Sequence, residues 1–182
     1  MENNIIDFVD KITEKNIDIC INNAGINIIK AIEEYSISEY NSLLNINLKA
    51  PSYIIKGVIP NMKKKKFGRI VNIASIWSNI SKVNRSLYSM TKSGLVGFTR
   101  TTALEGAEFN IIANCVSPGF TLTELTKKSL NNAEIEKLNS QIPLRRFAQP
   151  NEISQVVLFL ASELNTYVTG QNITVDGGYS II

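Results

Sequence analysis

Residues 17–25 read Ile-Asp-Ile-Cys-Ile-Asn-Asn-Ala-Gly, an apolar run rich in β-branched side chains that stops at a polar, glycine-ended turn. Such a run predicts a short buried strand followed by a tight turn. Two further stretches repeat the arrangement, since 69–74 stops at Ser75 and 110–116 stops at the Ser-Pro-Gly of 117–119. A strand that ends in a polar turn therefore recurs along the chain and decides its fold.

Helix-forming segments separate these strands. Apolar residues follow a 3.6-residue period over 3–15, which predicts an amphipathic helix. Ser36 and Glu39 form a capping box that opens a long helix, expected to run to about residue 62 with a kink at Pro51. The remaining expected elements are a helix over 85–108, a polar, helix-prone covering segment over 121–140, a helix from Pro150 and a strand over 172–175.

Strand and helix alternate throughout, and the strands are apolar on both faces. This pattern predicts a single α/β domain over 1–182, with a parallel sheet covered by helices on both sides. In such sheets, sites lie beyond the carboxyl ends of the strands. The turn at 22–25, Ser75 and the Pro-Gly pair at 118–119 are therefore expected to gather at one place.

Composition excludes several functions. Hydrophobic residues make up 44% and charged residues 19%, which favours a folded protein, and a net charge of +3 does not favour nucleic acid as a partner. The first residues lack the features of a secretory signal, so an intracellular, cytoplasmic protein is expected. The chain has no histidine, which rules out histidine-based triads and histidine metal sites, and we expect no metal. Cys20 and Cys115 stand alone in apolar runs and are interpreted as reduced core residues. No apolar stretch is long enough to cross a membrane, so no membrane partner is expected.

Tyr88 and Lys92 are four residues apart on an expected helix and share one of its faces. A tyrosine, whose ordinary pKa is near 10, becomes a useful acid or base when a fixed ammonium favours its phenolate and lowers that pKa. Ser75, at a strand end, can hydrogen-bond the same substrate oxygen. The alternative is an unremarkable surface pair, and Trp77, close by, is either a wall of the substrate pocket or a core residue.

Five motifs occur in a fixed order with characteristic spacing. They are the Asn-Ala-Gly turn at 22–25, Asn47 in its helix, Ser75 thirteen residues before the Tyr88-Ser89-Met90-Thr91-Lys92 segment, the loop at 117–119 with Thr121, and the closing segment 170–178. In these motifs the chain resembles the short-chain dehydrogenase/reductase family over essentially its whole length. The resemblance implies a Rossmann-like, three-layer fold.

The resemblance also implies catalytic roles. Tyr88 would donate a proton to the substrate carbonyl oxygen, or accept it in the reverse direction. Lys92 would lower the pKa of the tyrosine and hold the nicotinamide ribose, and Ser75 would position and polarise the carbonyl. Asn47 would anchor a water chain that leads from Lys92 to solvent, although a satisfied core amide is the alternative for this residue.

The cofactor implied by the resemblance is NAD or NADP, with no preference between them. Asn23, Ala24 and Gly25 would line its adenosine side, and the nicotinamide would be held by Pro118, Gly119 and Thr121, together with Tyr88 and Lys92.

The spacing is most similar to that of 3-oxoacyl-carrier-protein reductases, which implies an acyl-thioester substrate and a place in fatty acid biosynthesis. The two carrier-docking positions of that subfamily would fall at Lys66 and Phe109, so that one basic residue is kept and one is lost. The alternative for the four lysines at 63–66 is a solvated helix end whose positive charge complements the helix dipole. A sugar or small-alcohol dehydrogenase is the alternative among enzymes, and a homodimer or homotetramer is expected in each case.

The family's glycine-rich phosphate turn has no counterpart, because the first glycine of the chain is Gly25. The chain is therefore expected to be an N-terminally truncated, partial domain that lacks the first βαβ portion. The strand at 17–21 would then form an exposed, aggregation-prone edge. A catalytically silent remnant that acts only through subunit association is a further alternative.

Overall fold

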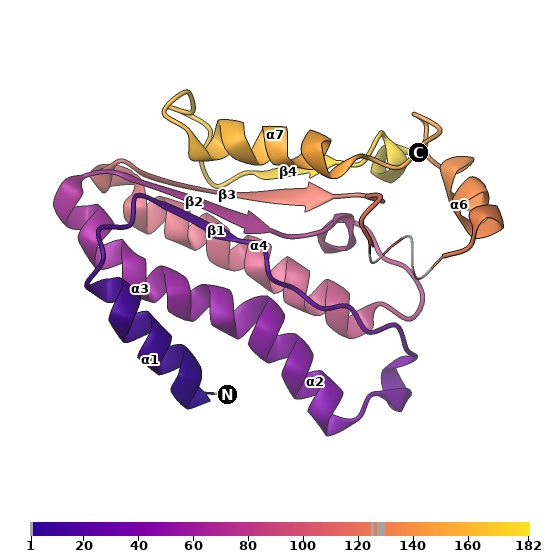
Figure 1. The fold of residues 1–182 in the computed structure, drawn as a ribbon, viewed down its shortest axis with the longest axis horizontal. Helices are drawn as coiled ribbons and strands as arrows, with labels where there is room; N and C mark the ends of the chain where they lie inside the picture. The colour runs from indigo at the N-terminus through magenta and orange to yellow at the C-terminus, as the bar shows by residue number, and fades with distance from the viewer. Residues whose placement is uncertain (1, 125, 127–129) are drawn as a thin grey trace.

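The computed structural model describes residues 2–124, 126 and 130–182, and its centre is a parallel sheet (Figure 1). Within these residues the sheet has four strands in the order β1-β2-β3-β4, and each neighbouring pair is parallel. The strands are β1 (Ile19–Asn22), β2 (Gly68–Ile73), β3 (Ile111–Pro118) and β4 (Asn172–Val175). The principal helices are α1 (Glu2–Thr13), α2 (Ile37–Leu44), α3 (Ala50–Lys65), α4 (Ser86–Gly106), α6 (Asn132–Asn139) and α7 (Pro150–Ala161).

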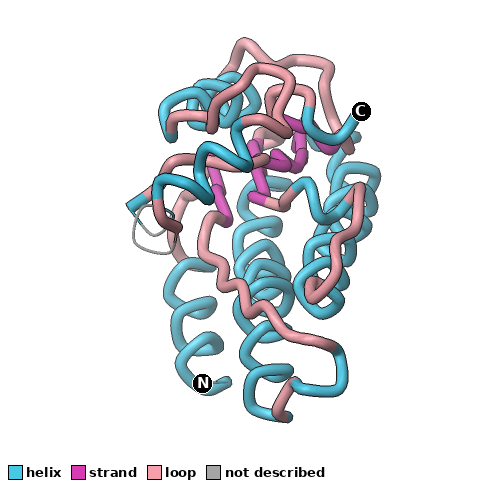
Figure 2. The backbone as a smooth tube through the Cα atoms, turned by 90° about the vertical axis from the view of Figure 1, so that its right-hand side faces the viewer, coloured by secondary structure: helices cyan, strands magenta, loops and turns pink. Residues whose placement is uncertain are grey.

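Helices cover both faces of the sheet. The helices α1, α3 and α4 lie on one side and α7 lies on the other (Figure 1), and the view turned by 90° shows the strands between the two helical layers (Figure 2). This arrangement buries the apolar side chains on both faces of the strands, because helices pack against each face. The expected three-layer, parallel α/β fold is confirmed.

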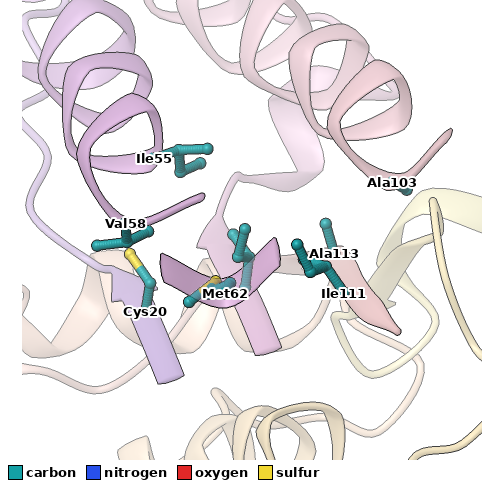
Figure 3. Close-up of a cluster of buried hydrophobic side chains, with 8 residues drawn as sticks. Cys20, Ile55, Val58, Met62, Ala103, Ile111 and Ala113 are labelled. Carbon is teal, nitrogen blue, oxygen red and sulfur yellow. The ribbon is translucent and has the colours of Figure 1, made fainter. Parts of the chain in front are cut away.

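A hydrophobic cluster joins α3 and α4 to the sheet (Figure 3). Its buried members are Cys20, Ile55, Val58, Met62, Ile70, Ala103, Ile111 and Ala113. A second cluster on the opposite face packs α7 against the middle strands, through Val71, Val116, Ile153, Leu160 and Ala161. Burying one large apolar side chain contributes about 1.5–3 kcal/mol, so these two clusters hold the three layers together. Both cysteines are buried and free, as expected.

The long helix expected after Ser36 is present, and its irregular turn lies directly before Pro51. Ser36 caps α2 as a capping box with Glu39. A π-helical turn at Asn45–Lys49 then connects α2 to α3, and Pro51 occupies the first turn of α3, where a missing N–H is tolerated. The irregular turn contains residue 47, whose backbone oxygen cannot receive a helical hydrogen bond from Pro51, because proline has no N–H. Such π turns are frequent at functional sites, and this one contains Asn47.

Strand β1 lies at the edge of the sheet, as the sequence predicted. Its side chains alternate, with Cys20 and Asn22 buried beneath the helices, while Ile19 and Ile21 are each 48% exposed on the other face. Helix α7 lies over the middle strands on that face and covers β1 incompletely. The strand therefore presents apolar side chains next to unpaired backbone groups.

The polar segment 121–140 contains α6, and residues 125 and 127–129 of it lie outside the described part of the chain. Across the described residues, none of the helices combines the length and the apolar character needed to span a membrane.

Candidate active site

The carboxyl ends of β1, β2 and β3 bring the expected site residues to one edge of the sheet. The register pairs Asn22 with Asn72, and Asn72 with Cys115. Ser75 follows Asn72 by three residues, and Pro118 follows Cys115 by three residues. Because parallel strands end on the same side, the three turns meet there. The gathering predicted from the sequence is therefore found.

Ser75 and Tyr88 contact each other at this edge. The Ser75 side chain is 6% exposed, accepts the backbone N–H of Trp77 at 3.3 Å and hydrogen-bonds the Tyr88 side chain. Tyr88 lies in the first turn of α4. Burial raises the pKa of Tyr88, while the hydrogen bond with Ser75 and the positive charge of Arg85 act in the opposite direction. The lowered pKa expected from the sequence is not found, because desolvation of the phenolate is the largest influence.

Lys92 lies one turn further along α4 and is almost fully buried, at 3% exposure. Its Nζ donates to the backbone oxygen of Ile73 at 2.7 Å and lies 5.8 Å from the centre of the Tyr88 ring. Burial lowers the pKa of this lysine to about 8. An ammonium has three donors, and the described residues supply one acceptor, so Lys92 retains donors for a ligand.

Asn47 fixes the turn after β1 against the helical layer. Its side-chain amide exchanges two hydrogen bonds of 2.8 Å with the backbone of Ile26, and its Nδ2 also donates to Thr91 Oγ1 at 3.2 Å. Thr91 in turn donates to the backbone oxygen of Tyr88 at 2.8 Å. Asn47 is fully buried, so these partners satisfy an amide that would otherwise be costly to bury. The structure thus connects Asn47 to both the Tyr88 helix and the turn at 22–25.

Gly25 lies where Lys92 and Asn47 converge. A Cβ atom placed on this glycine would be 3.3 Å from Lys92 Nζ and 3.4 Å from Asn47 Oδ1. Asn23, Ala24 and Gly25 are all exposed, in contrast to the buried Asn22 before them. The turn therefore presents an open backbone surface directly beside the buried ammonium.

The third turn is held by the end of β4. A Cβ on Gly119 would be 2.6 Å from Asp176 Cβ, so only glycine allows β3 and the segment after β4 to approach this closely. Thr121 donates to the backbone oxygen of Gly119 at 3.3 Å. Pro118, Gly119 and Thr121 are all partly exposed and remain accessible to a ligand.

These observations fit the nicotinamide half of a dinucleotide. The buried Lys92 ammonium has spare donors, and Gly25 leaves room beside it, as a ribose held by the lysine requires. In the family pattern a glycine-rich turn receives the pyrophosphate, and this chain contains no such turn. The described residues that fit a cofactor are therefore those expected at the ribose and the nicotinamide.

Trp77 belongs to an aromatic cluster next to Ser75. Its ring makes edge-to-face contacts with Phe120 at 6.4 Å and Tyr179 at 6.3 Å, and Phe120 stacks on Phe147 at 5.4 Å. Trp77 is 7% exposed, so it is a core residue of this cluster. Tyr179 also lines an open hollow of about 510 Å³, with Ile80, Ser140, Gln141, Ser180 and Ile182.

Sequence reasoning missed a buried polar chain beneath the site. Asn22 Nδ2 donates to Asn72 Oδ1 at 2.7 Å, and Asn72 Nδ2 donates to Thr99 Oγ1 at 2.8 Å. Cys115 donates to the same threonine at 3.1 Å. The asparagines stand at equivalent points of neighbouring strands, and this shared position in two apolar runs was the available indication. Burial raises the pKa of Cys115 to about 11, so its thiol stays neutral.

The lysine run at the end of α3 lies away from this edge. Lys66 is the left-handed C-cap of α3 and precedes β2, whereas Tyr88 meets Ser75 beyond the carboxyl end of that strand. Lys63 Nζ lies 4.6 Å from the centre of the Phe109 ring. The two expected docking positions, Lys66 within the lysine run and Phe109 beside Lys63, thus lie at the amino ends of the strands. Lys65 pairs with Asp18, which is consistent with a solvated helix end.

Comparison with known proteins identifies the ancestry of this arrangement. The family profile described as "Enoyl-(Acyl carrier protein) reductase" matches residues 2–180. The chain is 43% identical, over 176 residues, to the 3-oxoacyl-[acyl-carrier-protein] reductase of Buchnera aphidicola subsp. Schizaphis graminum. The alignment covers 96% of this chain and 72% of that protein. The chain belongs to the short-chain dehydrogenase/reductase family. The reductase of the same name from Aquifex aeolicus is 42% identical, over 89% of the chain and 65% of that protein.

Solved structures of the short-chain dehydrogenase/reductase family superpose on the whole chain. A gluconate 5-dehydrogenase from Burkholderia cenocepacia, in complex with NADP and tartrate, has a TM-score of 0.91 at 28% identity over 98% of this chain and 71% of the other. A crystal structure described as a putative betaketoacyl-ACP reductase has a TM-score of 0.88 at 32% identity, over 99% and 74%. The chain thus spans about two thirds to three quarters of the length of these relatives.

Proposed function

We propose that this chain is an NAD(P)H-dependent oxidoreductase that reduces the 3-oxo group of an acyl thioester. The nearby curated relatives that carry the name 3-oxoacyl-[acyl-carrier-protein] reductase support the substrate class. The NADP named with the related gluconate 5-dehydrogenase structure supports the cofactor. The observation that carries the proposal is the buried contact of Ser75 with Tyr88, with the Lys92 ammonium one helical turn away.

In the proposed reaction, Tyr88 gives its hydroxyl proton to the carbonyl oxygen as that oxygen gains charge. Ser75 hydrogen-bonds the same oxygen and fixes the position of the carbonyl carbon. When bound, the reduced nicotinamide supplies the hydride, and therefore both electrons, to that carbon. Tyr88 is left as a phenolate and regains a proton from solvent, and the positive charge of Lys92 favours the phenolate meanwhile. The product is a hydroxyacyl thioester.

Asn47 has a positioning role in this proposal. Its bonds to Ile26 and Thr91 hold the turn at Gly25 against the helix that carries Tyr88 and Lys92. The proposed ribose contacts on Lys92 and the proposed substrate contacts on Tyr88 are therefore kept in register. Asn23 and Ala24 provide exposed backbone for the adenosine side, and Pro118, Gly119 and Thr121 for the nicotinamide.

The test measures acetoacetyl-CoA-dependent oxidation of NADPH and of NADH by the 182-residue chain and by Tyr88→Phe. We expect the variant to lose at least about a hundredfold in kcat, because the phenolic proton is missing. Tyr167→Phe, altered at a side chain that is 96% exposed, is the matched control and is expected to behave like the wild type. Equal turnover by Tyr88→Phe would contradict the assignment of Tyr88. A wild type without turnover, together with no quenching of Trp77 by either cofactor, would favour a silent protein.

A second candidate, a dehydrogenase of polyhydroxy acids, is favoured by the solved relatives described as gluconate dehydrogenases. The same Tyr88 and Ser75 contacts would serve oxidation of a secondary alcohol. Oxidation of gluconate with NADP discriminates between the two candidates. Only the second candidate predicts that kcat/KM for gluconate oxidation exceeds kcat/KM for acetoacetyl-CoA reduction.

We further propose a cytoplasmic homodimer or homotetramer. Two free, buried cysteines support a reducing compartment. Exposed apolar side chains on the long helices support association, among them Leu104 of α4 at 79% and Ile37 of α2 at 77% exposure. Sedimentation equilibrium of the wild type and of Leu104→Lys tests this surface.

A further inference from the structure

Arg85 influences the pKa of Tyr88 through its charge, but the proposed reaction assigns no contact to its side-chain donors. It caps the N-terminus of α4 and precedes Tyr88 by three residues, so the two side chains are neighbours on one helix face. Two of its three side-chain nitrogens, Nε and Nη1, are buried and have no hydrogen-bond partner in the structure. A buried donor without an acceptor is unfavourable, more so when it carries charge, and each such group in a folded protein requires an explanation.

The surroundings of Arg85 supply contacts but no counter-charge. Its guanidinium carbon lies 5.7 Å from the centre of the Trp77 ring, and Lys82 Nζ lies 6.0 Å from the same ring. Among the described residues no ion pair includes Arg85; the electrostatic influences on it come from Tyr88 and Tyr35. Tyr35 donates its own hydroxyl proton to the backbone oxygen of Ile28. The site is therefore positive, and Nε and Nη1 together carry three N–H donors for which the described residues provide no acceptor.

The position relative to Tyr88 specifies where that acceptor must be. In the proposed reaction Tyr88 and Ser75 hold the oxygen that is reduced, and Arg85 precedes Tyr88 by three residues and contacts the Trp77 ring. A substrate oxygen close to the reacting carbonyl would reach both groups at once. A 3-oxoacyl group has such an oxygen, on C1, two carbon atoms from the carbonyl on C3.

We propose that Arg85 is a specificity-determining residue that donates hydrogen bonds to the C1 oxygen of the 3-oxoacyl substrate. This inference rests on the proposed function and extends it to the second oxygen of the substrate. Arg85 fixes the 1,3-dicarbonyl unit so that C3 meets Tyr88 and Ser75. A ketone without an oxygen on C1 leaves Arg85 unpaired and gains no hydrogen bond from it. The C1 oxygen belongs either to a thioester or to a free 3-oxo acid, and both present the same acceptor.

The experiment compares Arg85→Met with the wild type on three substrates, which are acetoacetyl-CoA, acetoacetate and 2-pentanone. Methionine keeps an apolar stem against Trp77 and removes the donors. We expect kcat/KM for acetoacetyl-CoA to fall about 10- to 100-fold, since one hydrogen bond to a charged donor is worth this much. We expect kcat/KM for 2-pentanone to fall by a clearly smaller factor, which measures the effect of the Arg85 charge on Tyr88 alone. Arg100→Met, on an exposed residue of the same helix, is the matched control and is expected to leave all three substrates unchanged. Arg85→Lys should restore part of the loss.

Two kinetic outcomes would overturn the proposal, and a third would identify the source of the C1 oxygen. Equal losses on acetoacetyl-CoA and 2-pentanone would mean that Arg85 acts through Tyr88 and not on C1. Unchanged kcat/KM in Arg85→Met would mean that its donors do not contact substrate. A loss confined to acetoacetate would support the C1 contact and assign that oxygen to a free 3-oxo acid, not to a thioester.

Ligand binding provides a readout that does not depend on turnover. Trp77 is the only tryptophan of the chain and contacts Arg85, so acetoacetyl-CoA should change its emission in the wild type. The titration midpoint should move at least about tenfold in Arg85→Met, and that of free CoA should not move. If the wild type reduces no acyl thioester but shows this difference, the proposed reaction fails and Arg85 still binds the C1 oxygen. Identical midpoints for the two proteins would reject the Arg85 contact whatever the activity.

Discussion

Lys92 illustrates how a charged residue is kept inside this fold at a cost to stability. Its side chain is 3% exposed and its pKa is lowered from 10.5 to about 8, because burial disfavours the ammonium. A displacement of this size corresponds to roughly 3 kcal/mol of unfavourable free energy. The hydrogen bond to Ile73 offsets about 1 kcal/mol of it. Residues that destabilise the folded state in this way are typical of functional sites.

Replacing Lys92 by methionine should therefore stabilise the protein while abolishing activity. We expect the free energy of unfolding at pH 7 to rise by about 1–2 kcal/mol. Between pH 8 and 10.5 the unfolded wild type holds a proton that the folded wild type has released, so wild-type stability rises with pH and the advantage of the variant shrinks. Urea unfolding at pH 7 and pH 10 measures both effects, with exposed Lys137→Met as control. A destabilised Lys92→Met at pH 7 would contradict this account.

The same residues predict how the rate depends on pH. Reduction requires a protonated Tyr88, and burial raises the pKa of this tyrosine, so its hydroxyl keeps the proton well into the alkaline range. It also requires charged Lys92, whose pKa is about 8. We therefore expect kcat/KM for reduction to fall as the pH rises through about 8, and oxidation, which needs a deprotonated Tyr88, to increase at higher pH. A reduction profile that stays flat from pH 6 to 10 would exclude this role for Lys92.

At the scale of elements, the strands β1 and β2 are joined by a buried amide pair as well as by their backbones. Asn72 accepts from Asn22 and donates to Thr99 of α4, so one side chain connects two strands and a helix. We expect Asn72→Ala to lower the free energy of unfolding by about 2–4 kcal/mol, because it leaves the Asn22 amide buried without an acceptor. Thermal or urea unfolding measures the loss. Asn151→Ala, on the exposed side of α7, is the control, and an equal small change in both variants would show that the amide chain is not structural.

These elements also show what the sequence could predict. Apolar runs that end in polar turns were sufficient for β1, β2 and β3, because a buried parallel strand has little other choice of residues. The capping box at Ser36 located the start of α2, because its hydrogen bonds join residues only three positions apart in the sequence. The π turn at Asn45–Lys49 could not be predicted, since it depends on how Asn47 meets Ile26 across the fold. Arg85 was missed because its unpaired donors become visible only in three dimensions.

The candidate site divides in the same way. Helix periodicity correctly placed Tyr88 next to Lys92, and the contact of Ser75 with Tyr88 agrees with the position of Ser75 after the end of a parallel strand. The direction of the Tyr88 pKa shift was not predicted correctly, because desolvation depends on packing around the ring and not on the spacing of charged residues. Trp77 could not be assigned from sequence, as its burial requires Phe120 and Tyr179 from distant segments.

For the whole molecule, we expect the edge at β1 to control how copies of the chain associate in solution. Ile21 is 48% exposed on a strand whose outer backbone groups have no partner strand in the described sheet. Such an edge is a template for pairing with another strand, and a charged side chain on it opposes pairing. We expect the 182-residue wild type to associate with increasing concentration and Ile21→Lys to associate less, with little change in unfolding free energy because the side chain is half-exposed. Light scattering over a concentration series measures the difference. Ile29→Lys, on a residue that is 57% exposed but outside the sheet, adds the same charge away from the edge. If Ile29→Lys reduces association as strongly as Ile21→Lys, net charge and not the strand edge controls association.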